Sequence, residues 1–319
     1  MKIYKFDYPI LPVKNIFVAL GTFDGLHLGH QQIIKQTVKE ATQLGVKAGV
    51  LTFSPHPRSV TNGQNPPPLI VDYKEKIKLL QGYGLDFCLI QHFTPEFAKL
   101  LASDFIKYYL VDALAVKGVV IGEDFRFGSQ GQGNYQTLQE AQDIYGFKTI
   151  VLKTLQKGKI DVSSSHIRSL IGLGKVDEVP AFLGRPFTLA GTVKKGDGRG
   201  RHLNYPTANI DLPAEVIKLK RGVYVAYVTI DNNEYPAVVN YGLRPTFQKQ
   251  DNELEVHVLN FEGNLYGQEL KISFVKYLRE EEKFNDFRQL QRRIALDVEE
   301  ARQILATVFL YKDASSVVK

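Results

Sequence analysis

The sequence contains a single cysteine, Cys88, so no disulfide can form within the chain and a cysteine-rich metal site is excluded. Cys88 lies in the apolar run 87–90, which predicts a buried and inert thiol. Long apolar runs are also missing, because Lys5, Asp7 and Lys14 interrupt the first twenty residues and no other window reaches the length of a membrane span. We therefore expect neither a signal peptide nor a transmembrane helix, and we expect a cytoplasmic protein.

Dense blocks of lysine and arginine are absent as well, although the formal net charge is +6. Such a surplus suits anionic partners, among them nucleotides, nucleic acid and anionic membrane surfaces. The basic residues are too dispersed, however, for a nucleic-acid-binding tail. A chain of 319 residues with 44% hydrophobic and 23% charged residues is typical of a globular protein with two domains.

The first part of the chain alternates short apolar runs with helical patterns. Strands are expected at 16–20, 46–53, 87–93, 116–121 and 147–152, and helices at 28–44, 73–80, 95–114 and 136–145. Such alternation is typical of a parallel, doubly wound α/β sheet whose strands are buried on both faces. Ligands bind beyond the carboxyl ends of the strands in these sheets, so we expect the chemistry in the loops that follow them.

The second part of the chain has strands without intervening helices. They are expected at 223–230, 235–240, 254–259 and 270–274, with turn sequences at 231–233 and 262–264. This order predicts a small antiparallel barrel or sandwich. A long helix follows, with an apolar face that can pack on the strands and consists of Phe287, Leu290, Ile294, Val298, Ala301 and Leu305. We expect two domains, residues 1–183 and 184–319.

Residues 21–30, Gly-Thr-Phe-Asp-Gly-Leu-His-Leu-Gly-His, occupy the turn from the first strand into the first helix. Glycines let backbone N–H groups approach a ligand, and a helix N-terminus carries a partial positive charge. His27 and His30 can donate hydrogen bonds to phosphate oxygens and stabilise the charge on a leaving pyrophosphate. They could instead be ordinary polar residues, or a metal pair that lacks a third ligand. The flanking glycines and the position after a strand favour a nucleotide site.

Three serines, Ser163 to Ser165, open another predicted helix, and Arg168 follows one turn later. A helix cap accounts for one or two of these hydroxyls. All three, with the guanidinium, are suited to hold the β- and γ-phosphates of a nucleotide, with Arg168 making bidentate contacts. The loop at 122–128 mixes charged and aromatic residues and does not by itself indicate a ligand.

These motifs resemble those of the nucleotidyltransferase superfamily. Together with residues 122–128 and the segment 52–57, Thr-Phe-Ser-Pro-His-Pro, they are similar to the FMN adenylyltransferase module of bacterial bifunctional FAD synthetases. The resemblance implies a Rossmann-like domain that transfers an adenylyl group from ATP to FMN. The residues that it implies for ATP are Gly21, Phe23, His27, His30, Ser164, Ser165 and Arg168, and those for the flavin are Phe53, Asp124 and Arg126. Ser165 stands where the family usually has threonine, which keeps the hydroxyl.

In the second part, residues 191–201 are predicted to form a glycine-rich basic loop after a short strand. This loop could hold phosphates or be only a flexible connection, and its spacing is not that of a Walker A loop. Thr207 and Asn209 follow in the segment Pro-Thr-Ala-Asn and offer hard oxygen ligands for Mg²⁺, although a turn into a strand is the simpler interpretation. Glu255 and His257 share one face of a predicted strand, where a carboxylate is either solvated or the base that a kinase needs.

The order of these motifs, with residues 222–224 and 240–247, is similar to riboflavin kinase over nearly the whole second half. The resemblance implies a six-stranded antiparallel barrel in which Glu255 takes the proton from the ribityl 5′-hydroxyl. It also implies an Mg–ATP site composed of Gly191, Gly196, Arg201, Thr207 and Asn209, with Thr207 and Asn209 on the metal. Asn204 replaces a usual glycine and tolerates left-handed backbone geometry.

Both resemblances together predict an enzyme that converts riboflavin to FMN and FMN to FAD with ATP and Mg²⁺. We expect these small molecules as partners of a monomer or weak homo-oligomer, without nucleic acid or membrane. One alternative is a single nucleotidyltransferase with a barrel that only binds or regulates. The other is an RNA-binding barrel, which the scatter of its tyrosines among apolar neighbours disfavours.

Overall fold

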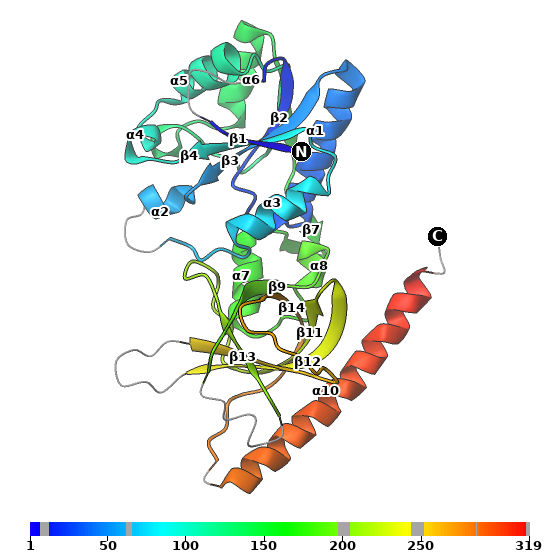
Figure 1. Cartoon of the computed structure of the whole chain (residues 1–319). Helices are drawn as coiled ribbons and strands as arrows, with labels where there is room; N and C mark the ends of the chain where they lie inside the picture. The colour runs from blue at the N-terminus through cyan, green and yellow to red at the C-terminus, as the bar shows by residue number, and fades with distance from the viewer. Residues whose placement is uncertain (7–12, 62–65, 197–204, 244–251, 285, 317–319) are drawn as a thin grey trace. The chain divides into compact units, whose positions relative to one another are not determined.

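The computed structural model describes residues 1–6, 13–61, 66–196, 205–243, 252–284 and 286–316. The chain divides into two compact units, Met1–His166 and Ile167–Lys319, each with its own architecture (Figure 1). No helix of the described residues is long and apolar enough to cross a membrane.

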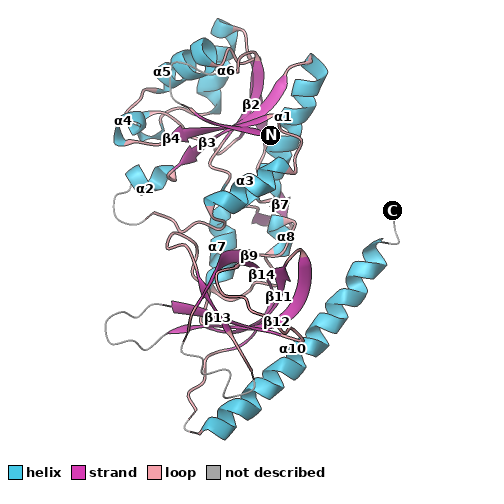
Figure 2. Ribbon diagram, in the orientation of Figure 1, coloured by secondary structure: helices cyan, strands magenta, loops and turns pink. Residues whose placement is uncertain are grey.

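The first unit is built on a six-stranded parallel sheet with the strand order β1-β4-β3-β2-β5-β6. Figure 2 shows helices around this sheet. The strands are β1 (Lys2–Lys5), β2 (Ile16–Leu20), β3 (Lys47–Ser54), β4 (Phe87–His92), β5 (Gly118–Gly122) and β6 (Lys148–Leu152). The five predicted strands and the parallel sheet are thereby confirmed. The sequence analysis missed β1, which is short and largely exposed and is defined by its parallel pairing with β4.

Helices connect these strands and cover the sheet. They are η1 (Asp24–Leu26), α1 (Leu28–Leu44), α2 (Pro57–Thr61), α3 (Tyr73–Gln81), α4 (Pro95–Ala98), α5 (Ala102–Asp104), the π-helical η2 (Phe105–Ala113), η3 (Ser129–Gly131) and α6 (Tyr135–Tyr145), with a hairpin of β7 (Gln156–Lys157) and β8 (Ile160–Asp161). The single helix expected over 95–114 is wrong, because Leu101 is extended and the backbone N–H of Ser129 donates to the Leu100 carbonyl at 2.6 Å. This tertiary hydrogen bond occupies the Leu100 carbonyl, which a continuous helix would use, at the point where the helical pattern is interrupted.

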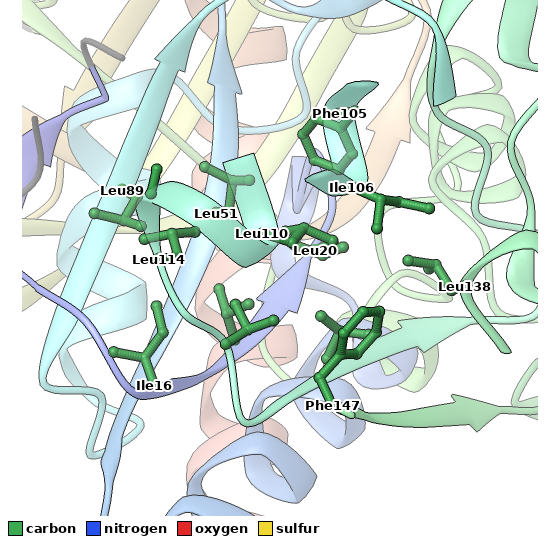
Figure 3. Close-up of a cluster of buried hydrophobic side chains, with 14 of the residues drawn as sticks. Ile16, Leu20, Leu51, Leu89, Phe105, Ile106, Leu110, Leu114, Leu138 and Phe147 are labelled. Atoms are coloured by element: carbon green, nitrogen blue, oxygen red, sulfur yellow. The ribbon is translucent and has the colours of Figure 1, made fainter. Parts of the chain in front are cut away.

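The alternation of side chains along the strands divides the core into two clusters, one on each face of the sheet. Ile16, Val18 and Leu20 of β2 pack on one face, where η2 contributes Leu110 and α6 contributes Leu138 (Figure 3). The intervening residues of β2, together with Cys88, pack on the other face against α1 and α3. Both faces are covered, which explains why the strands are apolar without alternation.

The second unit contains a closed six-stranded antiparallel barrel with the order β10-β13-β12-β11-β14-β9. Its strands are β9 (Thr188–Lys194), β10 (Ala208–Asp211), β11 (Gly222–Ile230), β12 (Asn233–Leu243), β13 (Asn252–Val258) and β14 (Glu269–Arg279), preceded by α7 (Ser164–Gly172) and α8 (Pro180–Leu183). β9 pairs with both β14 and β10, and this double pairing closes the barrel and excludes the sandwich.

The long helix α10 (Phe287–Ser316) follows the barrel and packs on it. Ala301 and Leu305 lie in a buried cluster with valines of β11 and β12, whereas Phe287, at the other end of the predicted apolar face, is 52% exposed. The Arg279 guanidinium of β14 binds both carboxylate oxygens of Asp297 in α10, at 2.9 and 2.7 Å, and Asp297 is only 2% exposed. The helix is therefore fixed by an apolar contact and by a buried ion pair.

Candidate active sites

The segment 21–30, here called the histidine turn, has an unusual backbone where β2 leads into α1. Phe23 and Leu26 have φ values of 51° and 44°, and Gly25 has a φ of 76°. Left-handed geometry is costly for residues other than glycine and persists where the surroundings enforce it. Here the buried carboxylate of Asp24 accepts the backbone N–H of Ile70 at 3.0 Å, which ties the turn to a distant loop.

His27 and His30 form one stacked unit at the start of α1. Their rings lie 3.6 Å apart between centroids, with an interplanar angle of 17°. His27 caps the helix, because its Nδ1 accepts the backbone N–H of His30 at 3.3 Å. A neutral imidazole whose Nδ1 accepts carries its proton on Nε2, so His27 offers an Nε2–H donor.

His30 is held in its neutral form. Burial lowers the pKa of His30 well below its usual value of 6.5, and the neighbouring His27 and Lys76 lower it further. Its Nδ1 is buried and has no hydrogen-bond partner within the described parts of the chain. Both histidines can therefore act on phosphate oxygens as hydrogen-bond donors.

Phe23, which the resemblance implies for ATP, has a side chain packed in the core. Its ring is fully buried and contacts the edge of the His30 ring at 5.4 Å between centroids. A Cβ at Gly21 would lie 3.1 Å from the Phe23 ring, so a side chain there would press on it. The Phe23 ring therefore supports the His30 imidazole.

The serine motif contacts the histidine turn, although Ser164 lies 140 residues after Asp24 in the sequence. Ser164 Oγ donates to the Asp24 carbonyl at 3.0 Å. Ser163 accepts the backbone N–H of His166 at 3.2 Å, and this confirms that one serine of the three caps the helix. Ser165 is exposed, and Arg168 is half-buried one turn further along α7.

The residues implied for the flavin follow two strands of the same sheet. Phe53, near the end of β3, is buried and contacts the rings of Phe93 and Phe97 at 5.7 and 6.1 Å between centroids. Asp124 and Arg126 are exposed in the loop after β5, where the Arg126 guanidinium donates to the Phe125 carbonyl at 3.0 Å. Because β3, β2 and β5 are adjacent and parallel, these segments and the histidine turn lie at the same edge of the sheet.

In the barrel, strand pairing brings two predicted site residues together. Asn209 of β10 lies directly opposite Glu255 of β13, and Thr207 immediately precedes β10. Directly opposite side chains in antiparallel strands point to the same face, with Cβ atoms about 5 Å apart. Asn209 is 7% exposed and Glu255 is half-buried, so a carboxylate and an amide share a confined corner.

A cavity of about 310 Å³ lies beside this corner. Its lining includes Gly196, Thr207 and Asn209 of the predicted site, but Glu255 is not among the described residues that line it. Residues 261 and 263–266 also line it. The pattern at 262–264 predicted only a turn, because nothing in the local sequence indicates that these residues share a cavity with Thr207 and Asn209.

The two glycines predicted for ATP have different surroundings. A Cβ at Gly196 would lie 2.0 Å from Asn209 Nδ2, so only glycine lets the Asn209 amide occupy its position. Gly191 is buried in β9, and a Cβ there would lie 2.3 Å from the Asp211 carbonyl oxygen. The loop expected from residue 191 onward therefore begins only after Lys194, and Gly191 serves close strand packing.

Arg201 and Asn204 lie outside the described residues, as do residues 244–247. His257 Nδ1 lies 2.8 Å from the Pro206 carbonyl, and since a carbonyl only accepts, Nδ1 is the donor. Burial is the main cause that lowers the pKa of His257. This bond fixes the residue that precedes Thr207.

The residues of the barrel corner fit a magnesium ion held jointly with phosphates. No cluster of three or more His, Cys, Asp or Glu side chains suited to a metal ion occurs in the described residues. Mg²⁺ needs no such cluster, because it keeps several waters and takes one or two protein oxygens besides the phosphate oxygens. The Thr207 hydroxyl and the Asn209 amide carbonyl are oxygen donors of this kind.

A parallel α/β unit with a histidine turn at a helix N-terminus, followed in one chain by a closed barrel with a cavity, is typical of a two-part enzyme of phosphate and nucleotide transfer. Comparison with known proteins identifies its family. Residues 12–166 match the family model described as FAD synthetase, and residues 183–305 match the one described as riboflavin kinase. The chain belongs to the family of bifunctional riboflavin kinase/FMN adenylyltransferases.

Curated relatives of that description match almost the whole chain. The one from Buchnera aphidicola subsp. Schizaphis graminum is 36% identical over 90% of this chain and 93% of its own length. The one from Escherichia coli K12 is 33% identical over 92% and 93%. Among solved structures, the crystal structure of a protein described as a macrolide-efflux protein from Streptococcus pneumoniae has a TM-score of 0.86 and 29% identity, and the match covers 95% of this chain and 99% of that one.

Proposed function

We propose that the barrel unit phosphorylates riboflavin to FMN and that the parallel-sheet unit adenylylates FMN to FAD, with ATP consumed in both reactions. The family membership supports both activities. The observation that carries the division of labour is the pairing of Glu255 with Asn209 in the barrel, because it joins a base and a metal ligand in a unit separate from the histidine turn.

In the kinase reaction, Glu255 takes the proton of the ribityl 5′-hydroxyl while that oxygen attacks the γ-phosphorus and ADP leaves. Thr207 and Asn209 hold Mg²⁺, which neutralises phosphate charge when it is bound. Gly196 leaves the space that the Asn209 amide needs. His257 fixes Pro206 and thereby the backbone that presents Thr207.

In the adenylyl transfer, a phosphate oxygen of FMN attacks the α-phosphorus of ATP and pyrophosphate leaves. No covalent enzyme intermediate is needed, because the FMN phosphate is already a nucleophile. His27 and His30 donate hydrogen bonds to the phosphate oxygens on which charge develops. Arg168 adds a cation to the phosphates.

Ser164 and Ser165 have different roles in this site. The single hydroxyl proton of Ser164 is used by the Asp24 carbonyl, so Ser164 orders the histidine turn in the ligand-free state. Ser165 is exposed at the helix start and contacts phosphate. Phe53, Asp124 and Arg126 form the flavin side of the same site.

We extend the proposal to the location, the oligomeric state and the domain boundary of the enzyme. The enzyme acts in the cytoplasm as a monomer or weak homo-oligomer, without nucleic-acid or membrane partners. The compact units divide between His166 and Ile167, whereas the riboflavin kinase match begins at residue 183. We place the domain boundary between residues 183 and 184, where α8 ends and Gly184 adopts a left-handed φ of 71°. Limited proteolysis and size-exclusion chromatography test the boundary and the oligomeric state.

Purified protein given riboflavin, ATP and Mg²⁺ is expected to yield FMN, then FAD and pyrophosphate, on chromatographic separation. Glu255→Gln should stop riboflavin phosphorylation and spare FAD formation from FMN, and His27→Asn should do the opposite. Glu215→Gln, a change at an exposed carboxylate of the barrel unit, should alter neither reaction. Loss of both reactions in each folded variant would contradict the assignment of one activity to each unit.

A further inference from the structure

Lys76 is a buried lysine of α3 that lies against the histidine turn and was not singled out by the sequence. The residue is 8% exposed, and its Nζ donates to the Thr22 carbonyl and to Thr52 Oγ1, both at 3.3 Å. The Thr52 hydroxyl donates to the same Thr22 carbonyl at 3.1 Å. Thr22 belongs to the histidine turn and Thr52 to β3, so the ammonium joins the ends of two adjacent strands.

The Lys76 ammonium has no ion-pair partner in the part of the chain that the structure describes. Burial lowers the pKa of Lys76, and the negative charge of Asp24 opposes this effect. The nearest aromatic contact is the Tyr73 ring, whose centroid lies 5.7 Å from Nζ. A buried ammonium without a paired carboxylate is costly, so its presence beside a proposed phosphate site indicates a role for its charge.

We propose that Lys76 is a positioning residue for adenylyl transfer. It fixes the Thr22 carbonyl, and with it the path of the histidine turn, and its charge provides positive potential where the ATP phosphates bind. The inference rests on the proposed function of the first unit. It goes beyond that function because it adds a residue outside the histidine and serine motifs.

The pKa of the neighbouring His30 distinguishes an effect of the Lys76 charge from a purely structural link between the two strands. Lys76 is one of the groups that lower the pKa of His30, together with burial and His27. A positive charge on Lys76 disfavours a second positive charge on the His30 imidazole and so helps to keep it a neutral donor. The two hydrogen bonds to Thr22 and Thr52 alone would fix the position of the turn and would not change the pKa of His30.

Three variants test the proposal in the full-length protein. Lys76→Met removes the charge but keeps the length of the side chain, Lys76→Arg keeps the charge, and Lys78→Met changes an exposed lysine of the same helix. Initial rates of FAD formation from FMN at varied ATP give kcat and KM separately. Riboflavin phosphorylation in the same samples and thermal unfolding report on the fold.

We expect Lys76→Met to lower kcat/KM for ATP in FAD formation about tenfold or more, because a displaced turn misaligns the reacting phosphates. Lys76→Arg should recover part of this loss, and Lys78→Met should match the unchanged protein. Riboflavin phosphorylation should stay the same in all three. A nuclear magnetic resonance titration should show a higher His30 pKa in Lys76→Met and no change in Lys78→Met.

Full FAD formation by Lys76→Met, or an unchanged His30 pKa in that variant, would overturn the proposal. Equal losses in Lys76→Met and Lys76→Arg would do the same, because a role of the charge requires rescue by arginine. If the unchanged protein formed no FAD, the proposed function would fail instead, and the His30 titration would still decide whether Lys76 acts on the histidine turn.

Discussion

The close contact between Gly196 and Asn209 allows a sharp test of the kinase site by a single methyl group. In Gly196→Ala the new Cβ would lie 2.0 Å from Asn209 Nδ2, whereas real Cβ atoms essentially never come within 3.0 Å of another atom. The Asn209 amide or the Gly196 backbone must therefore move by at least about 1 Å, and since both residues line the cavity, this displacement occurs in its wall. Gly196 is not among the glycines with positive φ, so the change acts through this contact alone.

A misplacement of about 1 Å in a catalytic site costs about 100-fold in rate, which corresponds to about 2.7 kcal/mol. We expect the kcat of riboflavin phosphorylation to fall by this factor in Gly196→Ala while FAD formation from FMN is unchanged. Initial rates of both reactions, measured by chromatography of the flavins, check the prediction. Gly172→Ala is the matched control, because a Cβ at Gly172 would meet nothing within 4 Å.

An unchanged kinase rate in Gly196→Ala would refute the reasoning, since it would mean that the Asn209 position is not needed for phosphate transfer. Equal loss of both activities would also refute it, because the contact lies within the barrel unit alone.

Three further predictions concern stability. Asp297→Asn should lower the free energy of unfolding of the barrel unit by about 3 kcal/mol in urea denaturation, because the largely buried Arg279 guanidinium then keeps only the half-exposed Glu282 carboxylate, at 3.7 Å, as an ion-pair partner; removing both charges with apolar residues should restore most of it. The pKa of His30 is lower in the folded protein than in the unfolded chain, so below pH 6.5 the unfolded chain binds a proton that the folded protein does not. The free energy of unfolding should therefore fall as the pH drops from 6.5, by at most about 1.4 kcal/mol per pH unit. His30→Asn should flatten that slope, and a slope identical to that of the unchanged protein would disprove the assignment. Gly49→Ala should destabilise the first unit by about 1–3 kcal/mol in the same assay, because the Cβ would lie 1.9 Å from the Phe87 ring.

Local patterns predicted the elements whose burial follows one regular pattern along their length. The helix over Leu28–Leu44 was predicted to the residue, because its apolar face, its histidine cap and the following Gly45 all agree. The strand Ile16–Leu20 was equally clear, since it is buried on both faces. The interruption of the helical stretch at Leu101 could not be predicted, because it depends on a hydrogen bond from the distant Ser129.

The sequence by itself determined the class of each half and the residue types of both sites, because glycine turns, helix starts and strand periods are properties of neighbouring residues. The strand pattern of the second half left a barrel and a sandwich open, and the barrel that the resemblance to riboflavin kinase implies is confirmed by the closed strand order. Only the tertiary structure decided that Glu255 lies opposite Asn209 and that Ser164 binds the Asp24 carbonyl. Lys76 belongs to the same group, since an amphipathic helix places lysines at many positions and burial alone distinguishes this one. Pairing, closure and burial arise from contacts between distant segments, and no local pattern contains them.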